Sequence, residues 1–265
     1  MKSIKQVLGL VATLLLSGGA STVAQSDIRG GWVADVDGTR HIYLFKVTGS
    51  DFTGAYCSRC DDAEDISVIR SGHITGDRLS FVLLSQTAGR WREQRVEGLV
   101  TANGVVLRGA GPGGTERRLA RADRPAPSPP PAAGGRPVPA PYVAPGPPER
   151  LTLDTVAGTW ISGTGPNAQV FMLSALEGKL VGLACGPCNT PWAMAPIEDG
   201  TVEGEHVTFY TAHQDWGAVF AAHGPYRNVL IGTVAKHQMR INSYVEGTAQ
   251  ENRFDFTLIG PIRKK

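Results

Sequence analysis

The residues best suited to chemistry are four cysteines, which form two Cys-x-x-Cys motifs. Cys57 and Cys60 make the first motif, and Cys185 and Cys188 make the second. An even number of cysteines in an exported chain favours disulfides. Because each motif lies in its own half of the chain, we expect one disulfide within each motif. Such a bond would fix a turn and would have a structural role.

Other chemistry of the two motifs stays open at this point. Two Cys-x-x-Cys turns brought together can hold a zinc ion through four thiolates. The second motif, Cys185-Gly186-Pro187-Cys188, has the letters of a thioredoxin active site. That chemistry needs the first cysteine at a helix N-terminus, and Pro191 and Pro196 follow here instead. Covalent haem attachment needs a His directly after the motif, where Asp61 and Asn189 stand.

A second group of chemically capable residues lies in the last quarter of the chain. Two His, one Asp, one Trp, one Tyr and one Arg fall within fifteen residues. Aromatic side chains supply apolar contact area, and a few polar groups orient a ligand. The predicted ligand-binding residues are Trp216, His213, Asp215, His223, Tyr226 and Arg227. We expect them to line a site for a small apolar or aromatic ligand.

The same group supports two further hypotheses. His213 with Asp215 has the composition of a general base for a hydrolase or an isomerase. His213 and His223 are candidate metal ligands, but their spacing fits no metal-binding signature. Because the chain has no nucleophile motif and no phosphate-binding glycine loop, we assign no catalytic residue, cofactor or metal. A structural or interaction protein without a pocket is the remaining alternative.

The chain contains two diverged copies of one module. When the chain is aligned with itself so that Gly30 falls on Gly158, nine identities appear in the 52 positions from Gly30 to Phe81, most of them Trp, Cys and Gly. Both Cys-x-x-Cys motifs coincide in this alignment. The match resumes after a gap with Gly98 on Gly232, so the second copy has six extra residues between Gly217 and Gly232. Self-similarity at a fixed period indicates a tandem repeat.

Each copy is predicted to be all-β. In the first copy we expect eight short strands bounded by turn residues, near Gly31–Asp35, His41–Val47, Phe52–Cys57, Ile66–Ile74, Arg78–Leu84, Arg92–Val100, Val105–Gly109 and Arg117–Ala120. Asp37-Gly38 and Asn103-Gly104 suit hairpin turns because these residues accept positive φ. No stretch after the N-terminus has a helical period. The pattern predicts two tandem antiparallel up-and-down barrels, or sandwiches.

The start of each copy resembles the lipocalin-like and avidin-like (calycin-type) β-barrels. The resemblance is carried by Gly30 and Trp32 in the first copy and by Gly158 and Trp160 in the second. In those families a Trp on the first strand closes one end of the barrel. The resemblance implies the same position for Trp32 and Trp160.

The N-terminus has the pattern of a secretory signal peptide. Lys2 and Lys5 precede a short apolar run at 7–16, and small residues follow up to Ala24, where we expect cleavage. The stretch 125–148 holds eleven of the eighteen prolines and is typical of an extended linker. The predicted organisation is a signal peptide at 1–24, a first module at 25–121, a Pro-rich linker at 122–150 and a second module at 151–265.

The net charge and the hydropathy of the chain limit the kinds of partner that it is expected to bind. The net charge is +2, which gives no electrostatic footprint for nucleic acid. We expect no membrane span in the mature chain, and the sequence identifies no protein partner. The four arginines at 117, 118, 121 and 124 are expected to be the solvated end of a strand. The leading hypothesis is an exported, periplasmic or secreted, non-enzymatic protein that binds a small molecule, with its site in the second copy.

Overall fold

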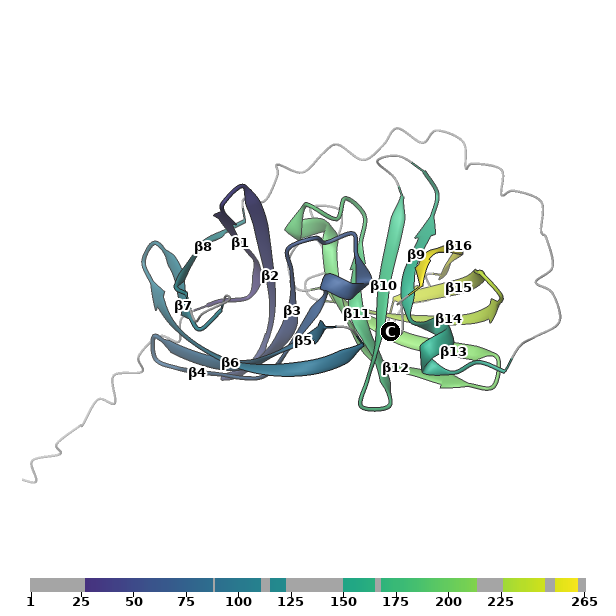
Figure 1. Ribbon diagram of the computed structural model, residues 1–265, viewed down its shortest axis with the longest axis horizontal. Coiled ribbons are helices and arrows are strands. Elements are labelled where there is room, and N and C mark those ends of the chain that lie inside the picture. The colour runs from purple at the N-terminus through teal and green to yellow at the C-terminus, as the bar shows by residue number, and fades with distance from the viewer. Residues whose placement is uncertain are drawn as a thin grey trace, which may run out of the picture.

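Two closed antiparallel barrels make up the protein (Figure 1). The computed structural model describes residues 27–87, 89–110, 115–122, 150–164, 168–213, 226–245 and 251–261. The first barrel consists of β1 Gly30–Val36, β2 Thr39–Thr48, β3 Asp51–Cys57, β4 Ser67–Thr75, β5 Arg78–Thr87, β6 Arg90–Thr101, β7 Gly104–Arg108 and β8 Arg117–Arg121. The second consists of β9 Gly158–Ser162, β10 Gln169–Leu176, β11 Lys179–Cys185, β12 Met194–Glu203, β13 His206–His213, β14 Tyr226–Ala235, β15 Gln238–Val245 and β16 Glu251–Pro261.

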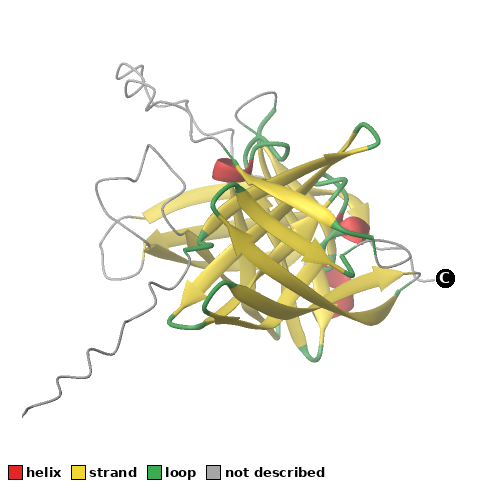
Figure 2. Ribbon diagram, turned by 90° about the vertical axis from the view of Figure 1, so that its left-hand side faces the viewer, coloured by secondary structure: helices red, strands yellow, loops and turns green. Residues whose placement is uncertain are grey.

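The predicted fold class is confirmed, and the architecture is a barrel rather than a sandwich. Each strand pairs with its sequence neighbours, and β1 and β9 pair with β8 and β16 to close the two barrels. Among the residues that the structure describes, helix is confined to short segments, drawn in red in Figure 2. The predicted linker falls almost wholly outside the described residues, as does the predicted signal peptide. No helix within the described ranges is long and apolar enough to cross a bilayer.

The strand β2 is buried on both faces, because its alternate side chains belong to two different apolar clusters. Alternate residues of a strand face opposite sides of the sheet. Tyr43 and Phe45 lie in the core of the first barrel, whereas Ile42 and Leu44 belong to a separate apolar cluster that includes residues of the second barrel. All four side chains are at most 1% exposed. Burial of such a side chain stabilises the fold by about 1.5–3 kcal/mol.

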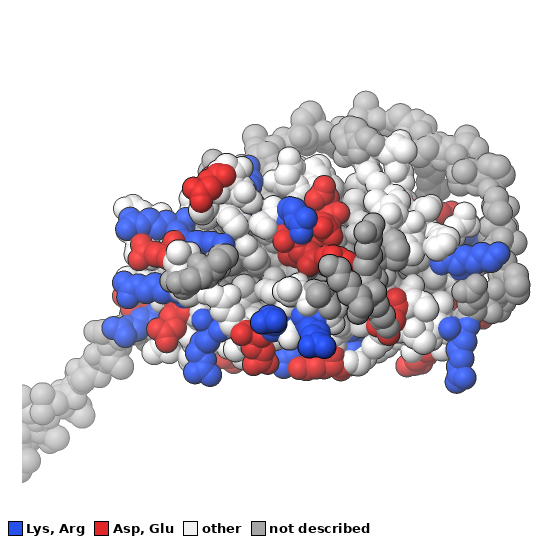
Figure 3. Space-filling model, in the orientation of Figure 1, with Lys and Arg blue, Asp and Glu red and all other residues white. Residues whose placement is uncertain are grey.

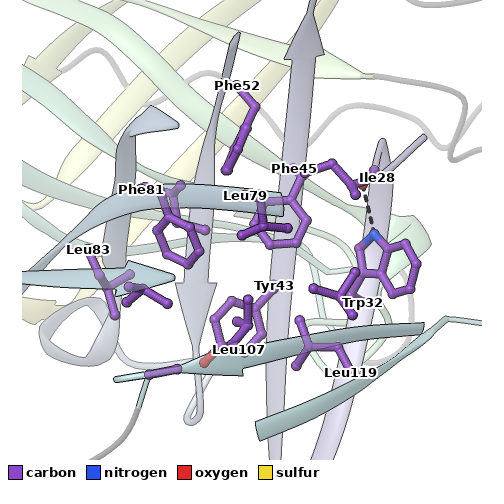
Figure 4. Close-up of a cluster of buried hydrophobic side chains, with 14 of the residues drawn as sticks. Ile28, Trp32, Tyr43, Phe45, Phe52, Leu79, Phe81, Leu83, Leu107 and Leu119 are labelled. Carbon is purple, nitrogen blue, oxygen red and sulfur yellow. Dashed lines mark hydrogen bonds between the residues drawn. The ribbon is translucent and has the colours of Figure 1, made fainter. Parts of the chain in front are cut away.

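Trp32 is buried in the core of the first barrel, beside Ile28 (Figure 4). Its indole Nε1 donates to the Ile28 carbonyl at 2.7 Å. The Arg121 guanidinium lies 4.8 Å from the ring centroid and donates to the carbonyls of Arg29 and Asp27. The ring is therefore held between the segment before β1 and the last strand of the barrel.

The second barrel repeats this arrangement in part. Trp160 Nε1 donates to the Val156 carbonyl at 2.8 Å, and Val156 ends the short helix α1, Leu153–Val156. Arg121 pairs with Trp32 in the first barrel, and Leu258 pairs with Trp160 in the second. The cation over the ring is thus replaced by an apolar side chain.

One hairpin turn in each barrel, between β1 and β2 in the first and between β10 and β11 in the second, takes the same backbone conformation. Asp37 and Gly38 have φ of 50° and 75°, and Glu177 and Gly178 have φ of 50° and 78°. Two successive residues with positive φ form the turn that matches the twist of paired strands. The hairpin predicted at Asp37-Gly38 is confirmed.

The two barrels pack against each other through equivalent faces, side by side in Figure 1. The shared cluster takes Ile42, Leu44, Ala55 and Cys57 from the first barrel and Met172, Leu183, Cys185 and Met194 from the second. In the alignment of the two copies, Leu44 falls on Met172, Ala55 on Leu183 and Cys57 on Cys185. An interface in which the same patch serves both partners has approximate twofold symmetry.

Each disulfide-bonded turn reaches across to the other barrel. The first turn leads into the short 3-10 helix η1, Ala63–Asp65, where the Ala63 N–H donates to Thr159 Oγ1 of β9 at 3.3 Å. The second leads into the 3-10 helix η4, Pro191–Ala193, which packs on β1. The contacts are therefore reciprocal. Cys57 is bonded to Cys60 and Cys185 to Cys188, which is the pairing predicted within each motif.

Substituting Gly31 tests this packing. A Cβ on Gly31 would lie 2.5 Å from Cβ of Pro191, in a rigid ring that cannot turn away. We expect Gly31→Val to lower the free energy of unfolding by about 1–3 kcal/mol, the usual cost of overpacking. Gly260→Ala is the control, because its nearest neighbours lie at 3.7 Å. Urea unfolding of the full chain measures both, and equal effects of the two changes would contradict the interface.

Candidate functional site

A buried polar cluster lies inside the first barrel, toward the end opposite Trp32. His41 and Tyr43 come from β2, Tyr56 from β3 and Arg117 from β8. The exposed fractions of His41, Tyr43 and Arg117 are 8%, 0% and 7%. Arg117 and Leu119 are the buried residues of β8, because this strand alternates between interior and solvent. The register brings Tyr43 opposite Tyr56 on neighbouring strands.

The cluster forms one hydrogen-bonded chain. Arg117 Nη1 donates to Tyr43 Oη at 2.7 Å and to Tyr56 Oη at 3.1 Å. Since Tyr56 Oη accepts from Arg117, its own proton can go to His41 Nδ1, 2.8 Å away. This direction makes His41 a neutral acceptor with its proton on Nε2. The Arg117 guanidinium also lies 5.5 Å from the centroid of the Tyr56 ring.

Burial governs the ionisation of these groups. Desolvation lowers the pKa of His41 below its ordinary value, and the nearby charge of Arg117 lowers it further. Desolvation raises the pKa of Tyr43, with Arg117 opposing it. Burial acts to lower the pKa of Arg117, but its contacts with Tyr43 and Tyr56 raise it overall. At neutral pH the cluster therefore holds one positive charge, on Arg117.

This charge has no carboxylate partner among the described residues. Every ion pair that the structure shows in those residues joins other groups, and the hydrogen bonds of Arg117 end on two neutral phenols. A buried cation is normally paired, because leaving it alone costs several kcal/mol. Arg117 is thus a cation of the barrel interior whose described hydrogen bonds all end on uncharged groups.

Small hydroxyl groups continue the polar lining of this end. Ser67 on β4 and Ser85 on β5 are partners in the register, and their hydroxyl oxygens lie 2.7 Å apart. Gln94 on β6 donates from Nε2 to the Gly109 carbonyl. On the other side of the cluster, Phe45 and Phe81 fill the barrel and contact each other edge to face. The cluster is therefore bounded by aromatic rings toward Trp32 and by hydroxyl and amide groups away from it.

The second barrel lacks the cluster. In the alignment of the two copies, Phe171 takes the place of Tyr43, and Ala184 takes the place of Tyr56. Phe254 pairs with Ile241 as Arg117 pairs with Leu107. Apolar side chains thus replace the phenols of Tyr43 and Tyr56 and the guanidinium of Arg117. Phe171 stacks on Phe256 with 4.4 Å between ring centroids, in an apolar interior.

The residues predicted as a ligand site in the second copy are only partly described. His213 ends β13 and pairs with Tyr226 at the start of β14, and Ala212 pairs with Arg227. The register thus places the backbone positions of His213, Tyr226 and Arg227 next to one another. Asp215, Trp216 and His223 lie outside the described residues. The general base of His213 with Asp215 and the metal pair of His213 with His223 stay predictions.

The prediction for Arg117 was wrong. The sequence indicated that it belonged to a solvated strand end, but the alternation of β8 buries Arg117 and leaves Arg118 with a side chain that is 83% exposed. The sequence signal that could have found the site is the alternation of the strand, which places Arg117 on the same face as the apolar Leu119.

A groove between the two barrels has a volume of about 680 Å³. Its charged residues are largely paired with one another. Lys46 bridges to Glu198 across the two barrels at 2.6 Å, and His73 contacts Asp51 at 2.8 Å. Over the described residues no group of His, Cys, Asp and Glu could hold a metal ion. On the face in Figure 3 cationic and anionic side chains are interspersed.

The cluster makes stability depend on pH through His41. Because its folded pKa is lowered, the unfolded chain takes up the proton first as the pH falls below about 6.5. We expect His41→Gln to reduce the acid-induced loss of unfolding free energy, by at most about 1.4 kcal/mol per pH unit for one proton. The second copy has Gln169 at the position equivalent to His41, so the module accommodates this change.

Urea unfolding between pH 7 and pH 5 checks this prediction. Parallel pH curves for the wild type and His41→Gln would refute it. The charged groups acting on His41 are Arg117, Asp65 and Asp35.

Comparison with known proteins gives no relative: no family model, curated protein or solved structure matches the chain.

Proposed function

We propose that the protein is an exported, non-enzymatic binding protein that takes a small molecule into the polar end of its first barrel. The observation that carries this proposal is the cluster of His41, Tyr43, Tyr56 and Arg117. Evenly apolar packing would stabilise a barrel at lower cost, as the second barrel demonstrates with Phe171 and Phe254. Polar groups set in an aromatic and aliphatic surrounding are the usual makeup of a ligand site.

Export is part of the proposal. Two disulfides fit an oxidising compartment, and the N-terminal pattern is that of a signal peptide cleaved near Ala24. The buried Trp32 on the first strand, with Arg121 over its ring, supports assignment to calycin-type barrels.

Thermal unfolding in the presence of a small-molecule library tests this function. Compounds that raise the unfolding temperature are then titrated against wild type and Tyr56→Phe. Loss of the Tyr56 hydroxyl removes one of the two phenols that hold the Arg117 guanidinium in place, so it should weaken them by about 5–10-fold, the equivalent of one hydrogen bond. Tyr210→Phe makes the same change on β13 of the second barrel and should leave affinity unaltered. A library without any stabilising compound, or hits insensitive to Tyr56→Phe, would contradict the proposal.

A site in the second barrel remains a distinct proposal. The pairing of His213 with Tyr226 favours it, since two of its six predicted residues adjoin. Changing Trp216 and Tyr226 to Ala should then abolish binding of those hits that survive Tyr56→Phe. For a hydrolase or isomerase, His213→Ala should abolish turnover, and retained turnover would remove His213 from that role.

A further inference from the structure

We propose that the ligand of the first barrel is a small monocarboxylic acid, whose carboxylate pairs with Arg117. This inference rests on the function proposed above and specifies the chemical class of the ligand. Two features of the site lead to it, the number of charges and the free donors, and the packing around the site limits the shape of the acid.

The charge of the site calls for one negative charge. Arg117 is 7% exposed and makes no ion pair within the described part of the chain. The segment 111–114, between β7 and β8, has the sequence Gly-Pro-Gly-Gly and supplies no carboxylate. Asp65, which acts on His41 through space, is already held by Ser58 and Arg59. A monoanion neutralises the single cation, whereas a dianion would leave a second charge buried without a partner.

The donors of the site match a planar carboxylate. A guanidinium has five N–H groups in a fixed fork that binds both oxygens of a carboxylate. In the described residues Arg117 uses only Nη1, on two phenols. Tyr43 Oη accepts from Arg117, and no described group accepts the proton of Tyr43 itself. One phenol and the unused side of the fork are thus available to the same anion.

The packing around Arg117 limits the size of the acid. Phe45, Phe81 and Leu107 are at most 2% exposed and fill the barrel on the side of Trp32. The body of the ligand must therefore extend the other way, past the ring of Tyr56 and toward Ser67 and Ser85. A compact acid with a flat or hydroxylated body fits this surrounding better than a long chain.

Calorimetric titration of the full chain at pH 7 and low salt tests this inference with benzoate, its neutral analogue benzamide and inorganic phosphate. We expect benzoate to bind at least about tenfold more tightly than benzamide, because a hydrogen bond to a charged group exceeds a neutral one. Arg117→Met should remove this preference, and Arg118→Met, which changes the adjacent exposed residue, should keep it. Arg117→Lys retains the charge without the fork and should bind benzoate with intermediate affinity, so it serves if Arg117→Met fails to fold.

The outcomes separate the two proposals. Equal binding of benzoate and benzamide, both weakened by Tyr56→Phe, would overturn the carboxylate and leave the binding function standing. Tighter binding of phosphate than of benzoate would also overturn the carboxylate. If none of the three probes binds while hits from the library do so at the polar end, the ligand is not a carboxylate. If no compound binds the first barrel at all, both proposals fall.

Discussion

Replacing Trp160 by Ala is expected to lower the free energy of unfolding by about 3–5 kcal/mol. The indole is 0% exposed and lies within the core of the second barrel. Its removal leaves a cavity that the barrel cannot collapse around, because β9 pairs on both sides. It also leaves the Val156 carbonyl without the hydrogen bond from Trp160 Nε1.

Trp192→Ala is the matched control for this prediction. Trp192 lies in η4 and is 36% exposed, so its removal should cost far less than that of Trp160. Urea unfolding of both variants, followed by circular dichroism, gives the two free energies. Equal losses would show that Trp160 is not an anchor of the barrel.

Removing both disulfides is expected to cost about 4 kcal/mol in total, because closing a loop as short as a Cys-x-x-Cys motif removes chain entropy from the unfolded state equivalent to about 2 kcal/mol per bond. Cys57 and Cys185 are 1% and 2% exposed and belong to the cluster shared by the barrels. The turns that they fix place η1 and η4 on the opposite barrel. The loss should therefore also weaken the contact between barrels.

The measurement compares unfolding with and without a phosphine reductant. The wild type should lose stability when the reductant is present, and a variant with all four cysteines changed to Ala should be equally unstable in both conditions. A wild type whose unfolding is indifferent to complete reduction, verified by intact mass, would contradict a stabilising role for the bonds.

Much of the fold could be predicted because it depends on local patterns. The strand predicted at His41–Val47 lies within β2, and the turn at Asp37-Gly38 has the expected positive φ. The repeat placed both cysteine pairs in equivalent positions, and both pairs are bonded. These features require only residue type and near neighbours.

The packing of the barrels against each other was not predicted, although the sequence holds a signal for it. The run Ile42-Tyr43-Leu44-Phe45 is apolar without alternation, as expected of a strand buried on both faces. Its counterpart at Val170–Leu173 has the same character. An outer face against water would have shown polar residues at Ile42 and Leu44.

The candidate site was also beyond the sequence, because its members are remote in the chain. Arg117 is separated from Tyr43 by 74 residues and from Tyr56 by 61. Only the closure of the barrel through β8 and β1 brings them together. The group around His213 was predicted as a site because its residues are close in sequence. Closeness in sequence does not indicate whether side chains lie inside a barrel.

The most direct test of the account is to map where ligands bind by nuclear magnetic resonance. Hits from the library would be titrated into isotope-labelled full chain while the amide, Tyr and Arg side-chain signals are followed. The account predicts that shifts concentrate on β2, β3 and β8, with the Arg117 side chain among the most affected signals, and that the second barrel stays unchanged. Shifts concentrated on β13 and β14 around His213 and Tyr226, with Arg117 unaffected, would contradict it.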